Sequence, residues 1–217
     1  RSEYSGGAGI GGTGLGSGVD GGTINISGGN ITANGGSWSS GIGGGKSGEG
    51  GTINISGGRI TATGGGSGIG GGAYAVGGTI NITGGDITAI GGSSGIGGGY
   101  NNGNEDNPAC DAAVTIMEEA TVKASSEYLG EAISANNGIL EAASTARILT
   151  ANFTEEQDSG TALEVYRTVY GDYLTGIAPS EAYLSTAFTV PAGTYNLKCS
   201  GNMQQYTNTG IPTAIDF

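Results

Sequence analysis

The stretch "GGTINISGGNITANGG", residues 21–36, returns twice along the chain with few changes. It reappears as "GGTINISGGRITATGG" at 50–65 and as "GGTINITGGDITAIGG" at 77–92, and each copy is followed by "SGIGGG". The step from Thr52 to Thr79 is 27 residues. Self-similarity at a fixed period of this size predicts a solenoid, in which each repeat contributes one structural unit.

Within each copy, apolar residues alternate with polar or very small ones, which is the period of a strand with one buried face. The segments "TINI", "NITA" and "GIG" of the first copy place Ile24, Ile26, Ile31, Ala33 and Ile42 inward. Three short strands joined by glycine-rich corners, in a unit of about 27 residues, predict an all-β fold, a parallel β-helix. We expect a right-handed coil, as crossovers between parallel strands are.

The segment "SSGIGGGKS", residues 39–47, ends like a phosphate-binding loop. The glycine that such a loop needs five residues before Gly45 is Ser40, and the same glycine run recurs at 67–72 and 94–99 without Lys-Ser. The segment therefore belongs to the coil. We expect Ile42 to point inward between outward-facing glycines, which would leave an almost bare face for a backbone or a flat polymer.

The repeat weakens towards the C-terminus. "AAVTIMEEATVKA" at 112–124 and "YLGEAISANN" at 128–137 predict a fourth, degenerate coil, so the helix is expected over residues 1–137. Residues 138–217 contain longer β segments with aromatic residues, separated by turn signals. This C-terminal β region consists either of irregular coils or of a small antiparallel domain that caps the solenoid.

Composition excludes several classes of function. The 217 residues include 49 Gly, no His and only 7 Lys plus Arg, for a net charge of −12. Such acidity disfavours nucleic acid as a partner, and the lack of His removes most hydrolase triads and the commonest zinc ligand. No stretch is apolar enough for a membrane span. The sequence opens without an initiator Met or a signal-peptide pattern, so we expect a mature chain or a fragment.

The cadence "GTINISGGxITAxGG…GIGGG" resembles the glycine-rich right-handed β-helix repeats of bacterial cell-surface proteins. The tail at 151–201 resembles the segment that closes related carbohydrate-binding chains, some of which bind pectate with calcium. The resemblance implies an extracellular or cell-surface protein whose partner is a polysaccharide or another surface polymer. No metal-site pattern of the family can be mapped onto individual residues here. Carbohydrate binding is therefore implied by analogy with these proteins alone.

Two sets of residues are candidates for ligand binding. The corner aromatics Trp38, Tyr74 and Tyr100 lie on variable loops, where recognition tends to concentrate. Trp38 stands on a two-residue insertion, where it either shields the coil beneath, which is the simpler interpretation, or forms a platform for sugar stacking. The second set forms outward polar ladders, which serve either as self-satisfying cross-strand stacks or as a regular surface for a polymer. Its members are Thr23, Thr52, Thr79, Asn25, Asn54 and Asn81.

Acidic residues supply the candidates for metal binding and catalysis. Asp20 lies in a glycine-rich turn, and Glu105 and Asp106 lie in the longest corner loop, where oxygen ligands suit calcium. Solvated turns are the simpler interpretation of both. Arg59 and Asp86 occupy equivalent places on neighbouring coils, where they predict an exposed ion pair rather than the paired carboxylates of a glycosidase.

We therefore expect a non-catalytic adhesion protein that binds carbohydrate or another surface polymer. A structural subunit that forms a fibre or surface layer by stacking β-helix ends is the alternative, and a polysaccharide lyase is the less favoured one. Cys110 and Cys199 are expected to form a disulfide, which an extracellular setting permits. A tail that continued the solenoid would instead hold them about three coils, roughly 14 Å, apart, too far for a bridge.

Overall fold

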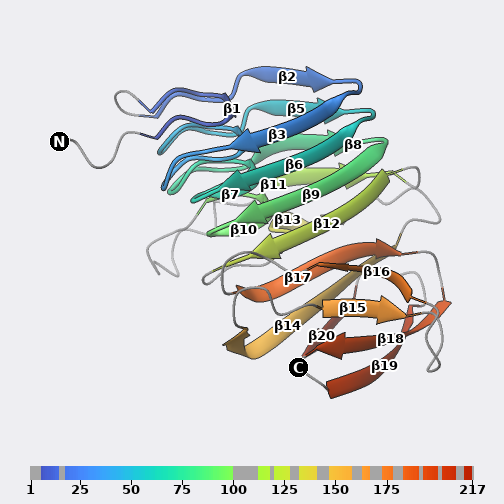
Figure 1. Cartoon of the computed structure of the whole chain (residues 1–217). Helices are drawn as coiled ribbons and strands as arrows, with labels where there is room; N and C mark the ends of the chain where they lie inside the picture. The colour runs from blue at the N-terminus through green and yellow to red at the C-terminus, as the bar shows by residue number, and fades with distance from the viewer. Residues whose placement is uncertain are drawn as a thin grey trace.

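The protein is described by a computed structural model, which is an all-β parallel β-helix followed by further strands (Figure 1). Its described residues are 6–14, 18–99, 112–117, 120–127, 132–140, 147–157, 163–166, 173–177, 183–190, 193–199, 202–208 and 213–216. Three sheets run along the solenoid, and a fourth lies in the tail.

Each coil contributes one strand to each of the three solenoid sheets. Sheet A contains β1 (Ile10–Gly11), β4 (Ile42–Gly43), β7 (Ser67–Gly70) and β10 (Ser94–Gly97). Sheet B contains β2 (Thr23–Ile26), β5 (Thr52–Ile55), β8 (Gly78–Ile82), β11 (Ala112–Ile116) and β13 (Ala135–Leu140). The solenoid part of sheet C contains β3 (Asn30–Asn34), β6 (Arg59–Gly64), β9 (Gly85–Gly91) and β12 (Ala120–Ser126).

The coils stack in the register that the repeat predicts. Thr23 pairs with Thr52 and Thr52 with Thr79, and the parallel pairing continues through Ile24, Ile53 and Ile80 in sheet B. The fourth coil is confirmed as well, because β11 pairs in parallel with β8, β12 with β9, and Ile133 forms a bridge with Ile96. Alignment of the same residue on each coil is what turns a sequence repeat into ladders of side chains.

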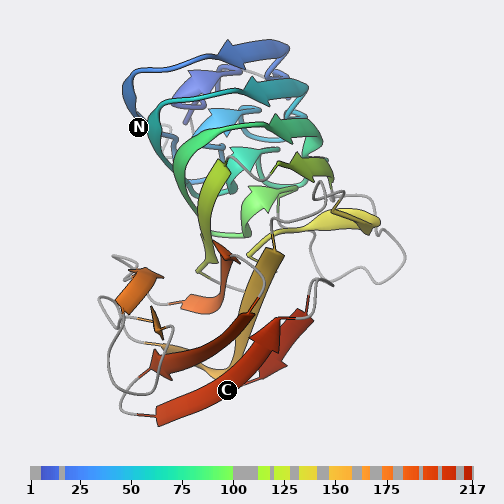
Figure 2. The same cartoon turned by 90° about the vertical axis from the view of Figure 1, so that its right-hand side faces the viewer.

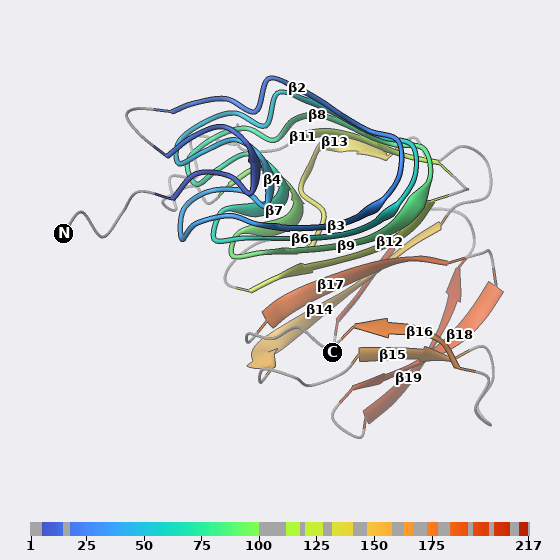
Figure 3. The ribbon, with the colours of Figure 1, turned by 45° about the horizontal axis from the view of Figure 1, so that its top comes forward.

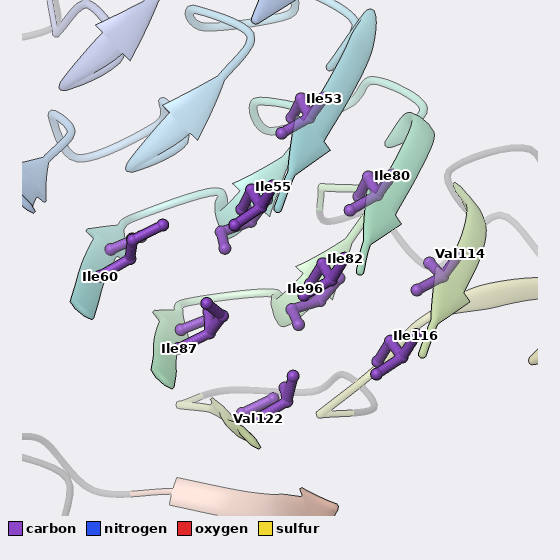
Figure 4. Close-up of a cluster of buried hydrophobic side chains, with 14 of the residues drawn as sticks. Ile53, Ile55, Ile60, Ile80, Ile82, Ile87, Ile96, Val114, Ile116 and Val122 are labelled. Carbon is purple, nitrogen blue, oxygen red and sulfur yellow. The ribbon is translucent and has the colours of Figure 1, made fainter. Parts of the chain in front are cut away.

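The core is a column of isoleucines that runs along the axis (Figure 4). Ile53, Ile80 and Ile82 are fully buried, whereas Ile24 and Ile31 of the first coil are only partly buried against the same cluster. Burying one such side chain is worth about 1.5–3 kcal/mol, so the ladders supply the favourable free energy that offsets the ordering of a glycine-rich backbone.

Sheet A departs from the expectation of a bare outward face. Both β7 and β10 are buried along their whole length, and a Cβ on Gly41 or Gly68 would meet backbone of sheet C and of the next coil instead of open space. The corner segments before and after sheet A extend beyond it and are hydrogen-bonded to each other outside it, from Ala73 N–H to the Trp38 carbonyl (Figure 3). The expected approach of a polymer to these glycines was therefore wrong.

A ladder of buried serines closes each turn around sheet A. The Ser40 hydroxyl donates to the Gly44 carbonyl at 2.9 Å, Ser67 to Gly71 at 2.7 Å and Ser94 to Gly98 at 2.8 Å. These serines fix the ends of the loops that cover the short strands, a role that the repeat pattern did not predict.

Beyond the fourth coil the strands become mainly antiparallel. β17 (Tyr183–Val190) pairs antiparallel with β12, β14 (Arg147–Gln157) pairs antiparallel with β17, and β20 (Thr213–Asp216) pairs in parallel with β14. Sheet D contains β15 (Leu163–Tyr166), β16 (Tyr173–Ile177), β18 (Gly193–Cys199) and β19 (Asn202–Asn208), all antiparallel.

From β14 onward the described tail strands pair antiparallel except for β14 with β20, and they do not continue the coils, whose stack ends above them in Figure 2. The expected division between residues 137 and 138 falls inside β13, which still pairs in parallel with β11. Ala187 of β17 packs in the solenoid core, so the tail continues both sheet C and the core.

Candidate ligand-binding platform

Two β-turns extend past sheet A and bring Trp38 and Tyr74 together. The first turn is closed by Ser39 N–H donating to the Gly36 carbonyl at 3.0 Å, with Ser37 and Trp38 at its centre. The second is closed by Ala75 N–H donating to the Gly72 carbonyl at 3.2 Å, with Ala73 and Tyr74 at its centre. Ala73 N–H then donates to the Trp38 carbonyl at 2.8 Å and joins the two turns.

The rings of Trp38 and Tyr74 are stacked. Their centroids lie 6.1 Å apart and their planes differ by 17°. Tyr74 is 43% exposed, and among the described residues Val19 is the other large apolar residue that is exposed. Trp38 is partly buried. We call this pair the aromatic platform. Its two members come from different coils: Trp38 lies in the corner before β4, and Tyr74 lies in the corner after β7.

Tyr74 has a backbone conformation that normally favours glycine. Its φ is +68°, at the third position of its turn, where a type II turn takes Gly or Asn. A bulky residue in the left-handed region costs about 1–2 kcal/mol. The chain places glycine at Gly11, Gly43, Gly70 and Gly97, all with positive φ, yet keeps tyrosine on this exposed turn. Strain of this kind concentrates at functional positions.

The preceding coil has the same turn without an aromatic ring. Gly48 N–H donates to the Gly45 carbonyl at 2.8 Å, and Ser47, in the place equivalent to Tyr74, has a φ of +58°. Ser47 N–H donates to the Ala73 carbonyl at 3.1 Å, so this turn and its Lys46 lie beside the platform. The corner loops thus share a backbone and differ in their side chains.

The members of the outward asparagine ladder of sheet B are hydrogen-bonded to one another. The Asn54 amide donates to the Asn25 side-chain oxygen at 2.9 Å, and the Asn81 amide donates to that of Asn54 at 2.9 Å. These hydrogen bonds support the interpretation of the asparagine row as a cross-strand stack that satisfies itself. Thr23, Thr52 and Thr79 lie in register beside it, and the binding of a ligand to either row stays a prediction.

The charged candidates have structural partners where they are described. The Asp20 Oδ1 accepts a hydrogen bond from Glu49 N–H at 2.8 Å, which ties the first corner to the second. Arg59 and Asp86 form the expected exposed ion pair, with 3.4 Å between Nη2 and Oδ2. Within the described residues there is no group of three or more acidic, His or Cys side chains that could hold a metal ion.

Several predicted residues lie outside the described part of the chain. They are Tyr100, Glu105, Asp106 and Cys110. The calcium site and the Cys110–Cys199 bridge therefore stay predictions. Cys199 itself is buried on β18.

Both platform residues could be singled out from the sequence, but their contact could not. They are 36 positions apart, and no periodicity links them because the Ser37–Trp38 insertion has no counterpart in the next coil. A local signal for Tyr74 was present: in "GAYA" at 72–75, an aromatic residue stands in a turn between glycine-rich segments, at a position where glycine is usual.

Comparison with known proteins agrees with the geometry. A family model described as a beta helix repeat matches residues 24–46, 53–73 and 80–100, one match for each of the three best copies. Searches of the curated proteins and of the solved structures found no match. The described residues include no helix long and apolar enough to cross a membrane. The match supports an extracellular or surface setting, which is common among such proteins. Together with the stacked parallel sheets, these three matches identify residues 24–100 as a run of beta helix repeats.

Proposed function

We propose that this protein binds carbohydrate outside the cell, without catalysis, and that the aromatic platform is its contact with the ligand. One observation carries the proposal: two aromatic rings from different coils stack on each other at exposed turns, at 6.1 Å and 17°. The C–H groups of a sugar ring form a flat apolar surface that packs against aromatic faces, and amphipathic rings with a polar edge suit a ligand rich in hydroxyl groups.

The strained backbone at Tyr74 supports the same proposal. A glycine would satisfy this turn without strain, as it does at other positive-φ positions of the coils. Stacking on Trp38 offsets part of this strain, so the fold accounts for some of the preference for an aromatic ring here. Binding of a ligand on a rigid scaffold supplies a second reason to keep the ring.

The alternative of end-to-end stacking receives less support. Head-to-tail assembly of the solenoid would require β12 of one copy to pair with β3 of the next, and β17 already occupies that edge of β12. Catalysis receives little support, since Arg59 and Asp86 are paired on the surface. We propose that calcium is not required by the platform, whose contacts are aromatic.

A glycan array with purified full-length protein tests the proposal. Tyr74→Gly removes the ring and suits the turn, and Trp38→Ala removes the other ring. Ser47→Gly is the matched control, because it makes the same backbone change one coil earlier and leaves both rings in place. We expect binding by the wild type and by Ser47→Gly, and loss in the two platform variants. No bound glycan, or binding that survives both platform variants, would refute the proposal.

A further inference from the structure

The N-terminal end of the solenoid presents two strand edges that have no paired strand among the described residues. β2 is the last strand of sheet B and β3 is the last strand of sheet C, whereas sheet A continues one layer further to β1 (Figure 1). Within the described part of the chain, the layer that β1 begins therefore has no strand in sheets B and C. The opposite end differs, because β17 covers the edge of β12.

Each later coil donates the same backbone N–H groups to the coil ahead of it. Thr52 N–H donates to the Gly22 carbonyl at 2.7 Å. One coil later, Thr79 N–H donates to the Gly51 carbonyl at 2.8 Å. Since parallel pairing alternates the direction of successive N–H groups, the equivalent donors of the first coil point at the open edges. These exposed residues are Thr23, Ser27 and Asn30.

The asparagine ladder also has a direction that continues past the first coil. Asn81 donates to Asn54 and Asn54 donates to Asn25, each time toward the N-terminal end. The exposed Asn25 Nδ2 is therefore the terminal donor of the ladder, and no described residue accepts a hydrogen bond from it. A side-chain oxygen in a layer ahead of the first coil would continue the ladder.

A glycine of the first coil leaves room for such a layer. A Cβ on Gly57 would lie 3.0 Å from the Ser27 carbonyl oxygen of the coil ahead, and a Cβ on Gly84 would lie 2.9 Å from that of Ser56. Gly28 is the equivalent residue of the first coil, and a Cβ there meets nothing within 4 Å. None of these three glycines has a positive φ. Close packing of a neighbouring backbone is therefore the reason for glycine at this place.

The open edges have none of the usual protection against added strands. Edge strands commonly carry charged residues or proline, and residues 21–44 contain neither. Ile24 and Ile31 are only partly buried, whereas their partners in the next coil, Ile53 and Ile60, are buried. Strands added here would complete the burial of the first coil.

We propose that this N-terminal edge binds a two-strand segment of another glycine-rich β-helix chain, which adds in parallel to β2 and β3 and completes the layer that β1 begins. The contact repeats the interface that joins each pair of coils, with isoleucines over Ile24 and Ile31 and a side-chain oxygen over Asn25. A second copy of this chain does not fit. Its C-terminal edge is covered by β17, and a head-to-head dimer would be antiparallel and held apart by two projecting β1 layers.

Hydrogen exchange of the full-length chain with a synthetic peptide tests the proposal. The probe has the sequence of residues 21–36, and in the control peptide each isoleucine changes places with the residue before it, which inverts the alternation. With saturating probe, we expect the amides of Thr23, Ser27 and Asn30 to exchange at least about tenfold more slowly, and the control peptide to change nothing. Gly28→Val should abolish the protection by blocking close approach. The matched control is Thr121→Val, which adds bulk at an exposed position of β12 and should respond as the wild type does.

The other outcomes overturn the proposal. Equal protection by the two peptides, or protection by neither, would show that the edge does not select a strand in register. Protection that persists in Gly28→Val would place the contact elsewhere. A dimer in light scattering of the chain alone, with these amides already protected, would assign the edge to a second copy. Glycan binding by the aromatic platform is measured separately and does not depend on any of these results.

Discussion

The inside of the solenoid and its corner loops follow opposite rules. Inside, the same residue recurs on coil after coil, as in Ile53 and Ile80, because each position must fit between identical neighbours. At the corners the backbone is kept and the side chains change, so that Ser47 on one coil corresponds to Tyr74 on the next. Repetition marks what the fold requires, and departure from repetition marks where a ligand can be recognised.

The largest effect is expected from a side chain added to a glycine of sheet A. Gly70 has a φ of +132°, and a Cβ there would overlap the Gly97 carbonyl of the next coil. Gly70→Ala should lower the free energy of unfolding by about 4 kcal/mol, from backbone strain and overpacking together. Urea unfolding measures this. Gly28→Ala is the control, because a Cβ at Gly28 meets nothing within 4 Å. Equal stability of the two variants would show that contact between neighbouring coils does not explain why glycine recurs at Gly43, Gly70 and Gly97.

The next effect comes from the isoleucine column. Ile82 is fully buried in the third coil, so Ile82→Ala should cost about 3 kcal/mol through lost burial and a cavity. Ile24, in the first coil, is only partly buried, and Ile24→Ala should cost clearly less. Thermal unfolding compares the pair. Equal losses would contradict a core that is less complete at the first coil.

A smaller effect is expected from the serine ladder. Ser67→Ala removes the hydroxyl donated to the Gly71 carbonyl, which still accepts a hydrogen bond from Ser67 N–H at 3.2 Å. We expect a loss of about 1 kcal/mol, since no buried carbonyl is left without a partner. The first coil shows that the fold tolerates this change, because Ala8 occupies the equivalent place and its N–H donates to Gly12. Chemical denaturation measures the free energy of unfolding of this variant. Ser56→Ala is the control, because Ser56 is exposed.

The smallest effect on stability is expected at the platform. Tyr74→Gly relieves the strain of a positive φ but gives the unfolded chain more freedom and removes the stacking contact, so its unfolding free energy should stay within about 1 kcal/mol of the wild type. Differential scanning calorimetry measures this change. A loss as large as that of Ile82→Ala would mean that the ring serves the fold, and the strain argument for binding would fail.

Much of the fold was predictable because its signals are local and repeated. Alternation placed Ile24, Ile26 and Ala33 inward, and the period gave the register of every parallel pair among the first three coils. The ion pair of Arg59 and Asp86 followed from the same register. The candidate site was predicted only as separate residues, since Trp38 and Tyr74 were singled out individually.

The coil, its three strands and its buried isoleucines can be read from the amino-acid pattern alone, since they depend on which residues lie two, or about twenty-seven, positions apart. Three other features became visible only in the folded chain: the corners close over sheet A, β17 pairs antiparallel with β12, and Trp38 lies against Tyr74. These outcomes depend on hydrogen bonds between segments with no common period. Their partners are fixed by the direction in which each turn leaves the coil, and turn direction is set by backbone angles that the sequence pattern does not contain.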